Sequence, residues 1–377
     1  MQYNRYELPV VSFGSDLVRA AFKLERLRGG FGQGSTPAVY LRELHSLFQL
    51  LMSVISARIE GNRTTVYDAL KEQPEPDDSS KEIANLIRAM EHLDRIDPAE
   101  PITHSLIRQL HHMTVTGLVR EGDPTPGAYR KRDVEITRSS HVPPSHVYVH
   151  AEMSDFLEFA NQDVGTSEQM IHVAIAHHRF LWVHPFTNGN GRVSRLLSYA
   201  MLRRHGFVSS TGLRTVNPTA VFGNDRDGYY EALSAADDLS NEGTVTWCTF
   251  FVTGILADME RLTRLQDFQF TLGELFLPTT RRMYEAGVIT EPERQALDIV
   301  FEKVVVKAGD LEPAFPGTPQ KRSAAINQLL EKGLLVQDTR GPRFYRVDLG
   351  NRRLGPYLIR QLDAIGFLPQ ILRDDRF

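Results

Sequence analysis

The segment that decides the fold is His184–Arg195, which reads HPFTNGNGRVSR and lies between two apolar stretches of helical texture. Gly189 and Gly191 bracket a turn, and we expect this turn to lead the chain into the N-terminus of a new helix. Glycine lets the backbone approach a ligand closely, and the free amides and positive dipole end of a helix start attract anions. The segment therefore predicts a site for phosphate groups.

Side chains around this turn suit a nucleotide. Arg192 and Arg195 are three residues apart on the expected helix, so they share a face and can both reach phosphate oxygens. His184 lies just upstream, where an imidazole can accept a proton from an attacking hydroxyl. Phe186 is expected to anchor the loop to the core. The pattern favours phosphate binding beside a proton acceptor.

This motif resembles the signature of the Fic (filamentation induced by cAMP) family, His-x-Phe-x-(Asp/Glu)-Gly-Asn-Gly-Arg-x-x-Arg. Every fixed position matches except the acidic one, which is Asn188 here. The resemblance covers roughly Gln49 to Ile255. It implies a mainly α fold, with a Fic-type helical core and a short β-hairpin flap.

A second motif lies upstream. Ser56–Gly61 reads SARIEG and resembles the family's inhibitory helix, (Ser/Thr)-x-x-x-Glu-(Gly/Asn). The resemblance implies that Glu60 pairs with Arg195 and keeps the γ-phosphate of ATP from its productive position. It places the chain in the class with an N-terminal inhibitory helix. The alternative for Glu60 is an exposed residue at a helix end.

The resemblance implies a protein adenylyltransferase, a nucleotidyltransferase that moves AMP from ATP to a Ser, Thr or Tyr hydroxyl of a protein target (AMPylation). The target can be the protein itself. His184 is then the general base and Glu60 the inhibitor, and Glu60 can also activate water for the removal of AMP. The alternative is a nucleotide-binding regulatory or DNA-binding protein with a weakly active Fic core.

ATP contacts are implied by the same resemblance. The glycine amides, Asn190 and Arg192 are expected at the α- and β-phosphates, and Arg195 at the γ-phosphate. Tyr229, Tyr230 and Asp237 resemble residues of the family's helix that covers adenine and ribose. Packing on a helix face explains the two tyrosines equally well. The expected ATP-binding residues are Glu60, Arg138, Ser139, Ser140, His141, Asn188, Gly189, Asn190, Gly191, Arg192, Val193, Ser194, Arg195, Tyr229, Tyr230 and Asp237.

Asn188 stands where the family's acidic residue holds Mg²⁺ or Mn²⁺. An amide oxygen can coordinate the metal but carries no charge, so we expect weak metal binding, with the diphosphate supplying most ligands. This departure also leaves room for kinase or phosphocholine-transfer chemistry. A zinc site is less favoured, because the adjacent His177 and His178 point apart on a helix and cannot share one face with His184. His111 and His112 are expected to be packed or exposed.

The composition is that of a globular protein with 377 residues, 41% hydrophobic and 24% charged. This balance argues against a disordered or fibrous chain. The net charge of -4 gives no reason to expect attraction to nucleic acid or membranes. Cys248 is the only cysteine, residues 1–10 do not resemble a signal peptide, and no apolar stretch approaches a bilayer span. We therefore expect a cytoplasmic protein with no membrane partner.

The chain is expected to divide into four regions. They are an N-terminal helical region (1–100) with the inhibitory helix at about 36–61, a Fic core (101–260), a winged helix-turn-helix-like module (285–350) and a C-terminal tail (351–377).

Helical spacing predicts helices at 16–28, from 35 to near 61, and at 80–93 and 103–116. Val134–Thr137 is the expected short strand. Gly127, Tyr129 and Arg130, followed by Arg138–His141 and the turn at 142–144, resemble the family's β-hairpin flap, which clamps the target segment by strand addition.

The C-terminal module is predicted from helices at 291–303 and 318–332, followed by two short strands within 334–347. Arg340, Arg343 and Arg346 on the wing could face nucleic acid, but the mixed charges favour protein docking, and we expect a homodimer.

Overall fold

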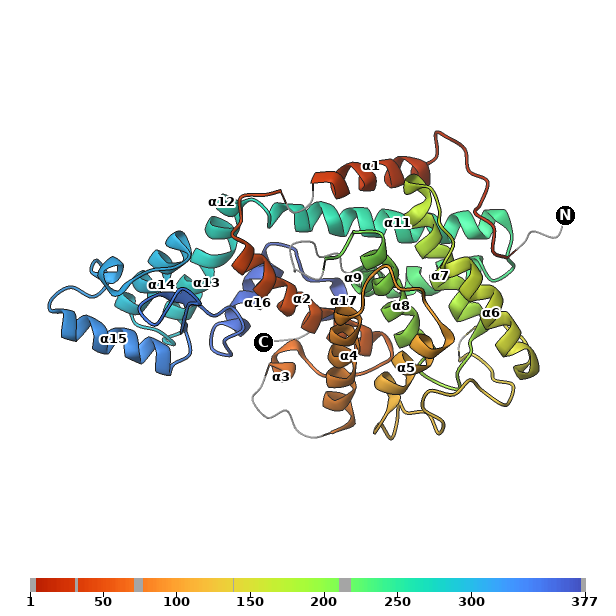
Figure 1. The fold of residues 1–377 in the computed structure, drawn as a ribbon, viewed down its shortest axis with the longest axis horizontal. Coiled ribbons are helices and arrows are strands. Elements are labelled where there is room, and N and C mark those ends of the chain that lie inside the picture. The colour runs from red at the N-terminus through yellow and green to blue at the C-terminus, as the bar shows by residue number, and fades with distance from the viewer. Residues whose placement is uncertain (1–4, 31–32, 71–76, 138, 210–217, 374–377) are drawn as a thin grey trace.

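The computed structural model describes residues 5–30, 33–70, 77–137, 139–209 and 218–373, and it confirms a mainly α fold (Figure 1). The longer helices are α1 (Asp16–Gly30), α2 (Ala38–Ile59), α4 (Asp78–Arg95), α5 (His104–Val115), α6 (Val149–Ala160), α7 (Gln169–Val183), α8 (Asn190–Arg204), α10 (Arg226–Ala235), α11 (Asn241–Arg264), α13 (Leu277–Glu285), α14 (Glu291–Lys303), α15 (Pro319–Glu331) and α16 (Gly355–Ala364). The shorter ones are α3 (Val66–Ala69), η1 (His146–Tyr148), η2 (Thr166–Glu168), α9 (Pro218–Asn224), α12 (Phe268–Phe270), η3 (Thr271–Phe276), η4 (Ala308–Leu311) and α17 (Gln370–Arg373). No helix of the described part is long and apolar enough to cross a membrane.

The core is built around α7, which is buried on nearly every side because its sequence is apolar all round. It packs against α8, α6 and α11, while α4 and α5 cover α8. Side-chain caps start several helices, such as Asp77 for α4 and Thr103 for α5. The turn between α7 and α8, which carries the sequence motif, therefore sits on a rigid helical frame.

Helix α2 joins the core to the C-terminal module, as Figure 1 shows. At its first turns Tyr40 packs against Phe276 and Phe301, with ring centroids 4.9 and 5.9 Å away. Glu43 binds Arg346 and accepts the Leu349 amide at 2.8 Å. The far end of α2 carries Glu60 into the motif region.

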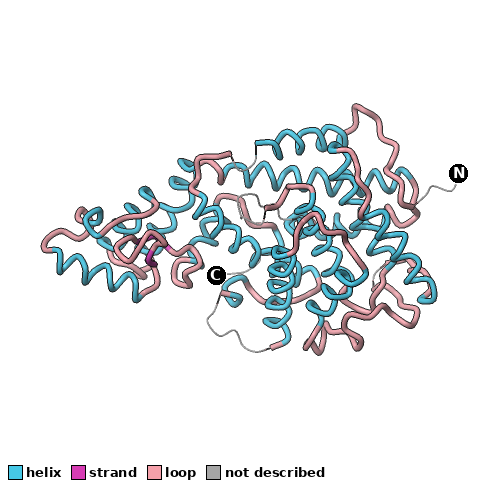
Figure 2. Tube along the Cα trace, in the orientation of Figure 1, coloured by secondary structure: helices cyan, strands magenta, loops and turns pink. Residues whose placement is uncertain are grey.

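The flap prediction is wrong in part. The connection between α5 and η1 is loop throughout its described residues (Figure 2), and Val134–Thr137 is not a strand. Pro143 and Pro144 have no amide hydrogens for a strand ladder. Asp133 instead accepts the His146 amide at 2.6 Å, so side-chain bonds to the backbone hold this loop.

The C-terminal module has the predicted helices α14 and α15 and two short strands, β1 (Leu335–Gln337) and β2 (Tyr345–Val347). The strands pair antiparallel, and Val306 bridges Tyr345 on the other side. This order of helices and strands is the one expected of a winged helix, an assignment that stays a prediction.

Residues 351–373, expected as a tail, include α16 and α17. Helix α16 packs on α13, and α17 packs on α9 and α2. Their apolar side chains, including Leu358, Leu362 and Leu372, are buried.

Candidate active site

His184 terminates α7 in the left-handed conformation, with φ 50°. This conformation is uncommon for a residue with a side chain, and the surroundings hold it in place. Arg130, which is buried, donates from Nε to the His184 carbonyl at 2.9 Å and from its amide to the Pro185 carbonyl at 2.9 Å. The loop that was expected to be a flap thus fixes the backbone of the predicted base.

One nitrogen of the His184 ring, Nε2, has no hydrogen-bond partner among the described residues. Nδ1 lies 3.3 Å from the Leu181 carbonyl, which can only accept, so Nδ1 carries the hydrogen and Nε2 is free to take a proton. Burial lowers the pKa of His184 to about 4, with the Arg130 charge acting in the same direction and Glu60 opposing it. The imidazole is therefore neutral at physiological pH.

Phe186 anchors the loop as predicted, and His111 is its main partner. The two rings stack at 3.7 Å with an angle of 6°. His111 donates from Nε2 to the Asn188 carbonyl at 3.1 Å and accepts the Gly127 amide at 2.9 Å. His111 is thus packed, as expected, but it also positions the motif backbone.

The α8 N-terminus is the predicted anion site, and a carboxylate lies on it. A Cβ at Gly191 would come within 2.3 Å of Glu60 Oε1, so a side chain there would push the carboxylate from its present position. Gly189 has φ 77° and makes the turn into the helix. The helix dipole and Arg195 both favour a negative charge at this position.

Glu60 and Arg195 form an ion pair, with Oε1 and NH2 at 2.7 Å. Arg195 also donates to the Ser56 hydroxyl at 2.8 Å and to the Ser56 carbonyl at 3.1 Å. Burial alone would raise the pKa of Glu60, but Arg195 and Arg192 outweigh it and leave that pKa below its usual value. Glu60 is therefore ionised, and it pairs with Arg195, the arginine that was expected to bind the γ-phosphate.

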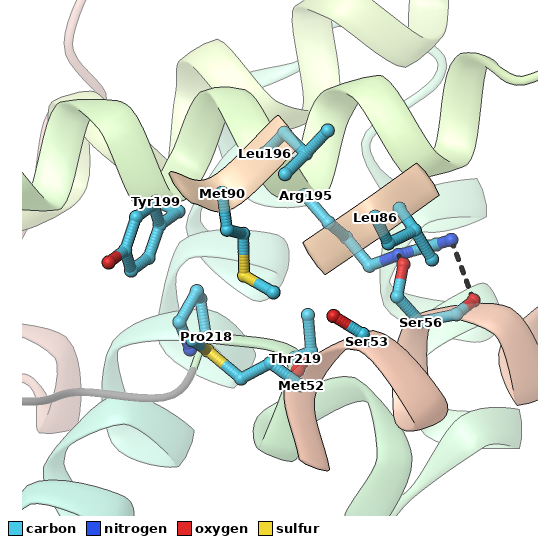
Figure 3. Close-up of a pocket in the computed structure, with 10 residues that line it drawn as sticks. All are labelled: Met52, Ser53, Ser56, Leu86, Met90, Arg195, Leu196, Tyr199, Pro218 and Thr219. Atoms are coloured by element: carbon cyan, nitrogen blue, oxygen red, sulfur yellow. Dashed lines mark hydrogen bonds between the residues drawn. The ribbon is translucent and has the colours of Figure 1, made fainter. Parts of the chain in front are cut away.

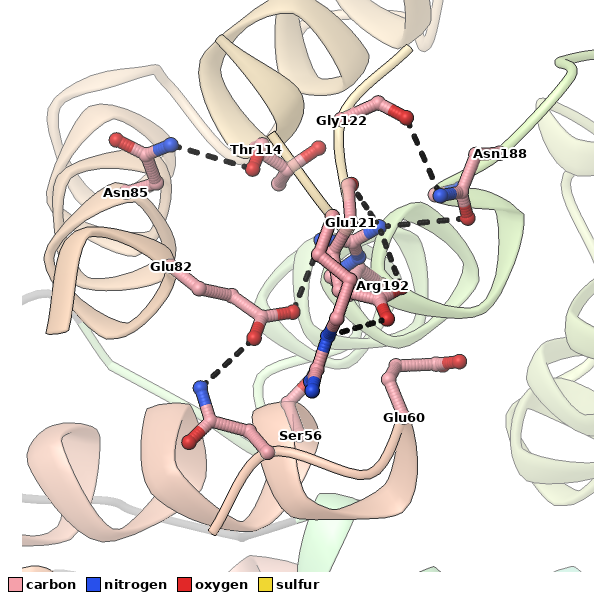
Figure 4. A network of polar contacts seen from close by, with 12 residues as sticks. Ser56, Glu60, Glu82, Asn85, Thr114, Glu121, Gly122, Asn188 and Arg192 are labelled. Atoms are coloured by element: carbon pink, nitrogen blue, oxygen red, sulfur yellow. Dashed lines mark hydrogen bonds and ion pairs between the residues drawn. The ribbon is translucent and has the colours of Figure 1, made fainter. Parts of the chain in front are cut away.

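Arg192, which is 1% exposed, has other partners (Figure 4). It donates from NH1 to Glu82 at 2.9 Å and from NH2 to the Glu121 carbonyl at 2.8 Å. Its NH2 lies 3.5 Å from Asn188 Oδ1, and its buried Nε has no partner among the described residues.

Three motif residues turn their side chains inward. Asn190 accepts the Phe186 amide at 3.0 Å and donates to the Phe186 carbonyl at 2.9 Å, so it shapes the loop. Val193 and Ser194 are fully buried, and the Ser194 hydroxyl donates to the Gly191 carbonyl. The structure thus gives these side chains roles within the protein rather than towards a nucleotide.

The residues near Asn188 do not make a cation site of their own. Asn188 Oδ1 accepts the Gly189 amide at 2.7 Å and faces the Arg192 guanidinium, whose charge opposes a cation there. In the described ranges no cluster of three or more His, Cys, Asp or Glu could hold a metal. The donor set therefore does not fit Mg²⁺ or Mn²⁺ without phosphate oxygens.

The remaining predicted contacts lie around α10 and the loop. Tyr229 is buried with its hydroxyl 2.9 Å from His177, whereas Tyr230 is 45% exposed. Asp237 pairs with His178 at 3.2 Å, and His141 lies 2.8 Å from the Trp182 carbonyl. Ser139 accepts the His141 amide, Ser140 is exposed, and Arg138 lies outside the described residues.

A small cavity of about 20 Å³ lies behind Arg195 (Figure 3). Helices α2, α4, α8 and the start of α9 line it, and Arg195 points from it towards Ser56. The volume suits about one water molecule, not a nucleotide.

Comparison with known proteins identifies the domain that contains the motif. The model of the Fic/DOC family matches residues 101–202, which include His184, the turn and both arginines. The chain carries a Fic domain. Glu60 lies outside the matched range.

Two relatives of this Fic domain are named protein adenylyltransferase Fic. The one from Nematostella vectensis is 30% identical over 160 residues, covering 41% of this chain and 34% of the relative. The one from Drosophila willistoni is 30% identical over 171 residues, covering 45% and 30%. The match thus spans about a third of the length of these curated relatives.

Solved structures show the same fold. A Fic family protein from Desulfovibrio desulfuricans G20 has a TM-score of 0.57 at 18% identity, covering 90% of this chain and 98% of its own. Fic-1 (residues 134–508) from C. elegans has a TM-score of 0.51 at 22% identity, covering 66% and 71%. At these identities the likeness supports the Fic fold.

Proposed function

We propose that this protein transfers AMP from ATP to a hydroxyl group of a protein, and that Glu60 restrains the reaction. One observation carries the proposal: the Glu60 carboxylate already occupies a position beside Gly191 at the α8 N-terminus and against Arg195, at the end of the turn that His184 begins. An anion fits there, and the ATP phosphates are the anions that the Fic domain of named adenylyltransferases suggests.

The chemistry follows from the groups at the site. His184 Nε2 accepts the proton of the target hydroxyl, whose oxygen forms a bond to the α-phosphorus. The bond from that phosphorus to the bridging oxygen breaks, and pyrophosphate leaves. Arg195 and the α8 amides offset the phosphate charge, so catalysis depends on positioning and electrostatics. Glu60 must leave the α8 N-terminus before the γ-phosphate can reach Arg195.

The position of the label separates AMP transfer from kinase chemistry. Full-length protein incubated with α-phosphate-labelled ATP and Mg²⁺ or Mn²⁺ should incorporate label into protein, including itself. The same reaction with γ-labelled ATP should incorporate none. Labelling by γ-labelled ATP alone would replace this proposal with a kinase.

The neutral His184 sets the pH dependence. Because its pKa is about 4, kcat/KM for AMP transfer should stay flat from about pH 8 down to about pH 6, after correction for the titration of ATP. Below this range the rate should fall as the imidazole gains a proton and can no longer act as a base. A midpoint near 6.5, the ordinary histidine value, would show that His184 is solvated in the working enzyme.

An acid at position 188 should strengthen metal dependence. In Asn188→Asp the carboxylate gains a charge that Mg²⁺ prefers, so the Mg²⁺ concentration for half-maximal labelling should fall about tenfold. Asn188→Ser is the control, since it adds no charge. Equal Mg²⁺ requirements in all three proteins would mean that residue 188 does not meet the metal.

The rival function, a regulatory or DNA-binding protein, would rest on the C-terminal module. Two of its three predicted wing arginines have carboxylate partners: Arg346 binds Glu43, and Arg340 binds Asp338. The enzyme is therefore favoured, and a homodimer, a cytoplasmic location and removal of AMP remain proposals.

A further inference from the structure

The turn after α2 is connected to both motif arginines. Glu60 contacts Arg195 directly, at 2.7 Å. Two residues later, Asn62 donates from Nδ2 to Glu82 Oε2 at 2.8 Å, and Glu82 Oε1 accepts from Arg192 at 2.9 Å. The second connection consists of two hydrogen bonds instead of one, and it runs through Glu82 on α4.

This second connection is buried more deeply than the first. Asn62, Glu82 and Arg192 are 5%, 2% and 1% exposed, whereas the Glu60 side chain is 28% exposed. A buried ion pair is costly to separate, because either partner left alone keeps an uncompensated charge. Glu82 therefore stays with Arg192, and Glu60 is the carboxylate that can leave.

The guanidinium of Arg192 is held at both of its terminal nitrogens. Glu82 and the Glu121 carbonyl take NH1 and NH2, and the buried Nε is without a partner in the described chain. Figure 4 shows Glu82 on the α4 side of Arg192 and Asn188 on the other. Glu82 thus holds one side of the arginine, and the longer contact with Asn188 on the other side is the one that a phosphate can replace.

A second acid competes for Arg192. The Glu121 carboxylate lies 4.0 Å from Arg192 NH2 and is 24% exposed. If Glu82 lost its charge, Glu121 would be the nearest anion, and Arg192 would turn towards it, out of its present orientation.

We propose that Glu82 is a positioning residue for nucleotide binding: it holds Arg192 in the orientation in which a diphosphate meets it, and Asn62 supports Glu82. This inference rests on the proposed function, because it assumes that the phosphates of ATP reach Arg192. It assigns the Glu82 charge a role distinct from that of Glu60. Glu60 blocks the anion site, whereas Glu82 prepares it.

The test measures ATP binding by calorimetry in the full-length Glu60→Gly protein, with Mg²⁺ present. Adding Glu82→Gln should weaken ATP binding about tenfold, the effect of losing a charge-assisted hydrogen bond that orients a ligand-binding group. Adding Glu121→Gln as well should restore most of the affinity, because no competing carboxylate then remains. A general loss of packing would not be repaired by a second substitution.

The matched control is Asp94→Asn. Asp94 also joins α4 to α8, through Arg203 at 3.3 Å, but at the opposite end of α8. The Asp94→Asn substitution should lower thermal stability without changing ATP affinity. If Glu82→Gln does not fold, Asn62→Ala takes its place, with a smaller loss of about threefold expected because Asn62 supports the Glu82 carboxylate and does not bind Arg192 itself.

The outcomes separate the two proposals. If Glu60→Gly does not bind ATP, the proposed function fails and this inference falls with it. If Glu60→Gly binds ATP and Glu82→Gln binds it equally or more tightly, only the inference is overturned. The same holds if Glu121→Gln fails to restore the lost affinity.

Discussion

Replacing Glu60 by glycine should raise labelling by α-labelled ATP about tenfold to a hundredfold. ATP must displace the Glu60 carboxylate from Arg195, which it contacts at 2.7 Å, and from the space beside Gly191 that a Cβ would fill. A charge-assisted hydrogen bond contributes about 1.5–3 kcal/mol, and each 1.4 kcal/mol is about tenfold in apparent affinity. Labelled protein is counted after gel separation at an ATP concentration below saturation.

Two further variants make this result specific. Glu60→Gln keeps the size of the side chain but loses the charge, so its labelling should lie between those of wild type and Glu60→Gly. Glu285→Gly also replaces an acid at a helix end, at the exposed last residue of α13, and should leave labelling unchanged. Labelling of Glu60→Gly no higher than wild type would show that Glu60 does not restrain the enzyme.

The Glu60→Gly protein should also gain more thermal stability from ATP than the wild type does. Without Glu60, the buried Arg195 keeps the Ser56 contacts but lacks a counter-charge. The free energy of unfolding should therefore fall by about 1–3 kcal/mol. Bound ATP supplies that counter-charge and stabilises only the folded state. The rise in Tm on adding ATP should therefore be larger for Glu60→Gly than for wild type.

Local sequence patterns predicted much of the helical structure. The spacing of apolar residues gave helices near α1, α2, α4, α5, α14 and α15, and these predictions are confirmed within a few residues. The strand at 134–137 was wrong because β-branched residues favour a strand only where a partner strand can pair with them. Here the side chains of Arg130 and Asp133 hold the loop instead.

The site was predictable where the motif itself carries the chemistry. Two short motifs predicted the contact between Glu60 and Arg195, which are 135 residues apart, and the structure has it. Glu82 and Asn62 were missed, because nothing in their neighbourhood marks them and their role depends on α4 packing beside α8. His111 was seen only as a packing residue, since its bond to the Asn188 carbonyl depends on tertiary structure. The residues that contact a motif from distant parts of the sequence can be identified only once the fold is known.

Replacing His184 in the Glu60→Gly protein should abolish labelling while leaving ATP binding within about threefold. A positioned general base contributes about a hundredfold to ten-thousandfold in rate. The His184 ring is bonded to the Leu181 carbonyl, whereas Arg192 is held by Glu82 and Arg195 by Ser56, so the phosphate-binding groups stay in place without it. Labelling and calorimetric ATP binding are measured on the same preparation.

The left-handed backbone of His184 dictates the choice of substitution. Alanine at φ 50° adds backbone strain, which could shift the turn and lower activity for a reason unrelated to proton transfer. Asparagine tolerates this conformation and has no basic nitrogen. His184→Asn should therefore fold like the parent, bind ATP and still fail to transfer AMP. If His184→Asn retains labelling while His184→Ala loses it, residue 184 serves the turn, and another group must accept the proton.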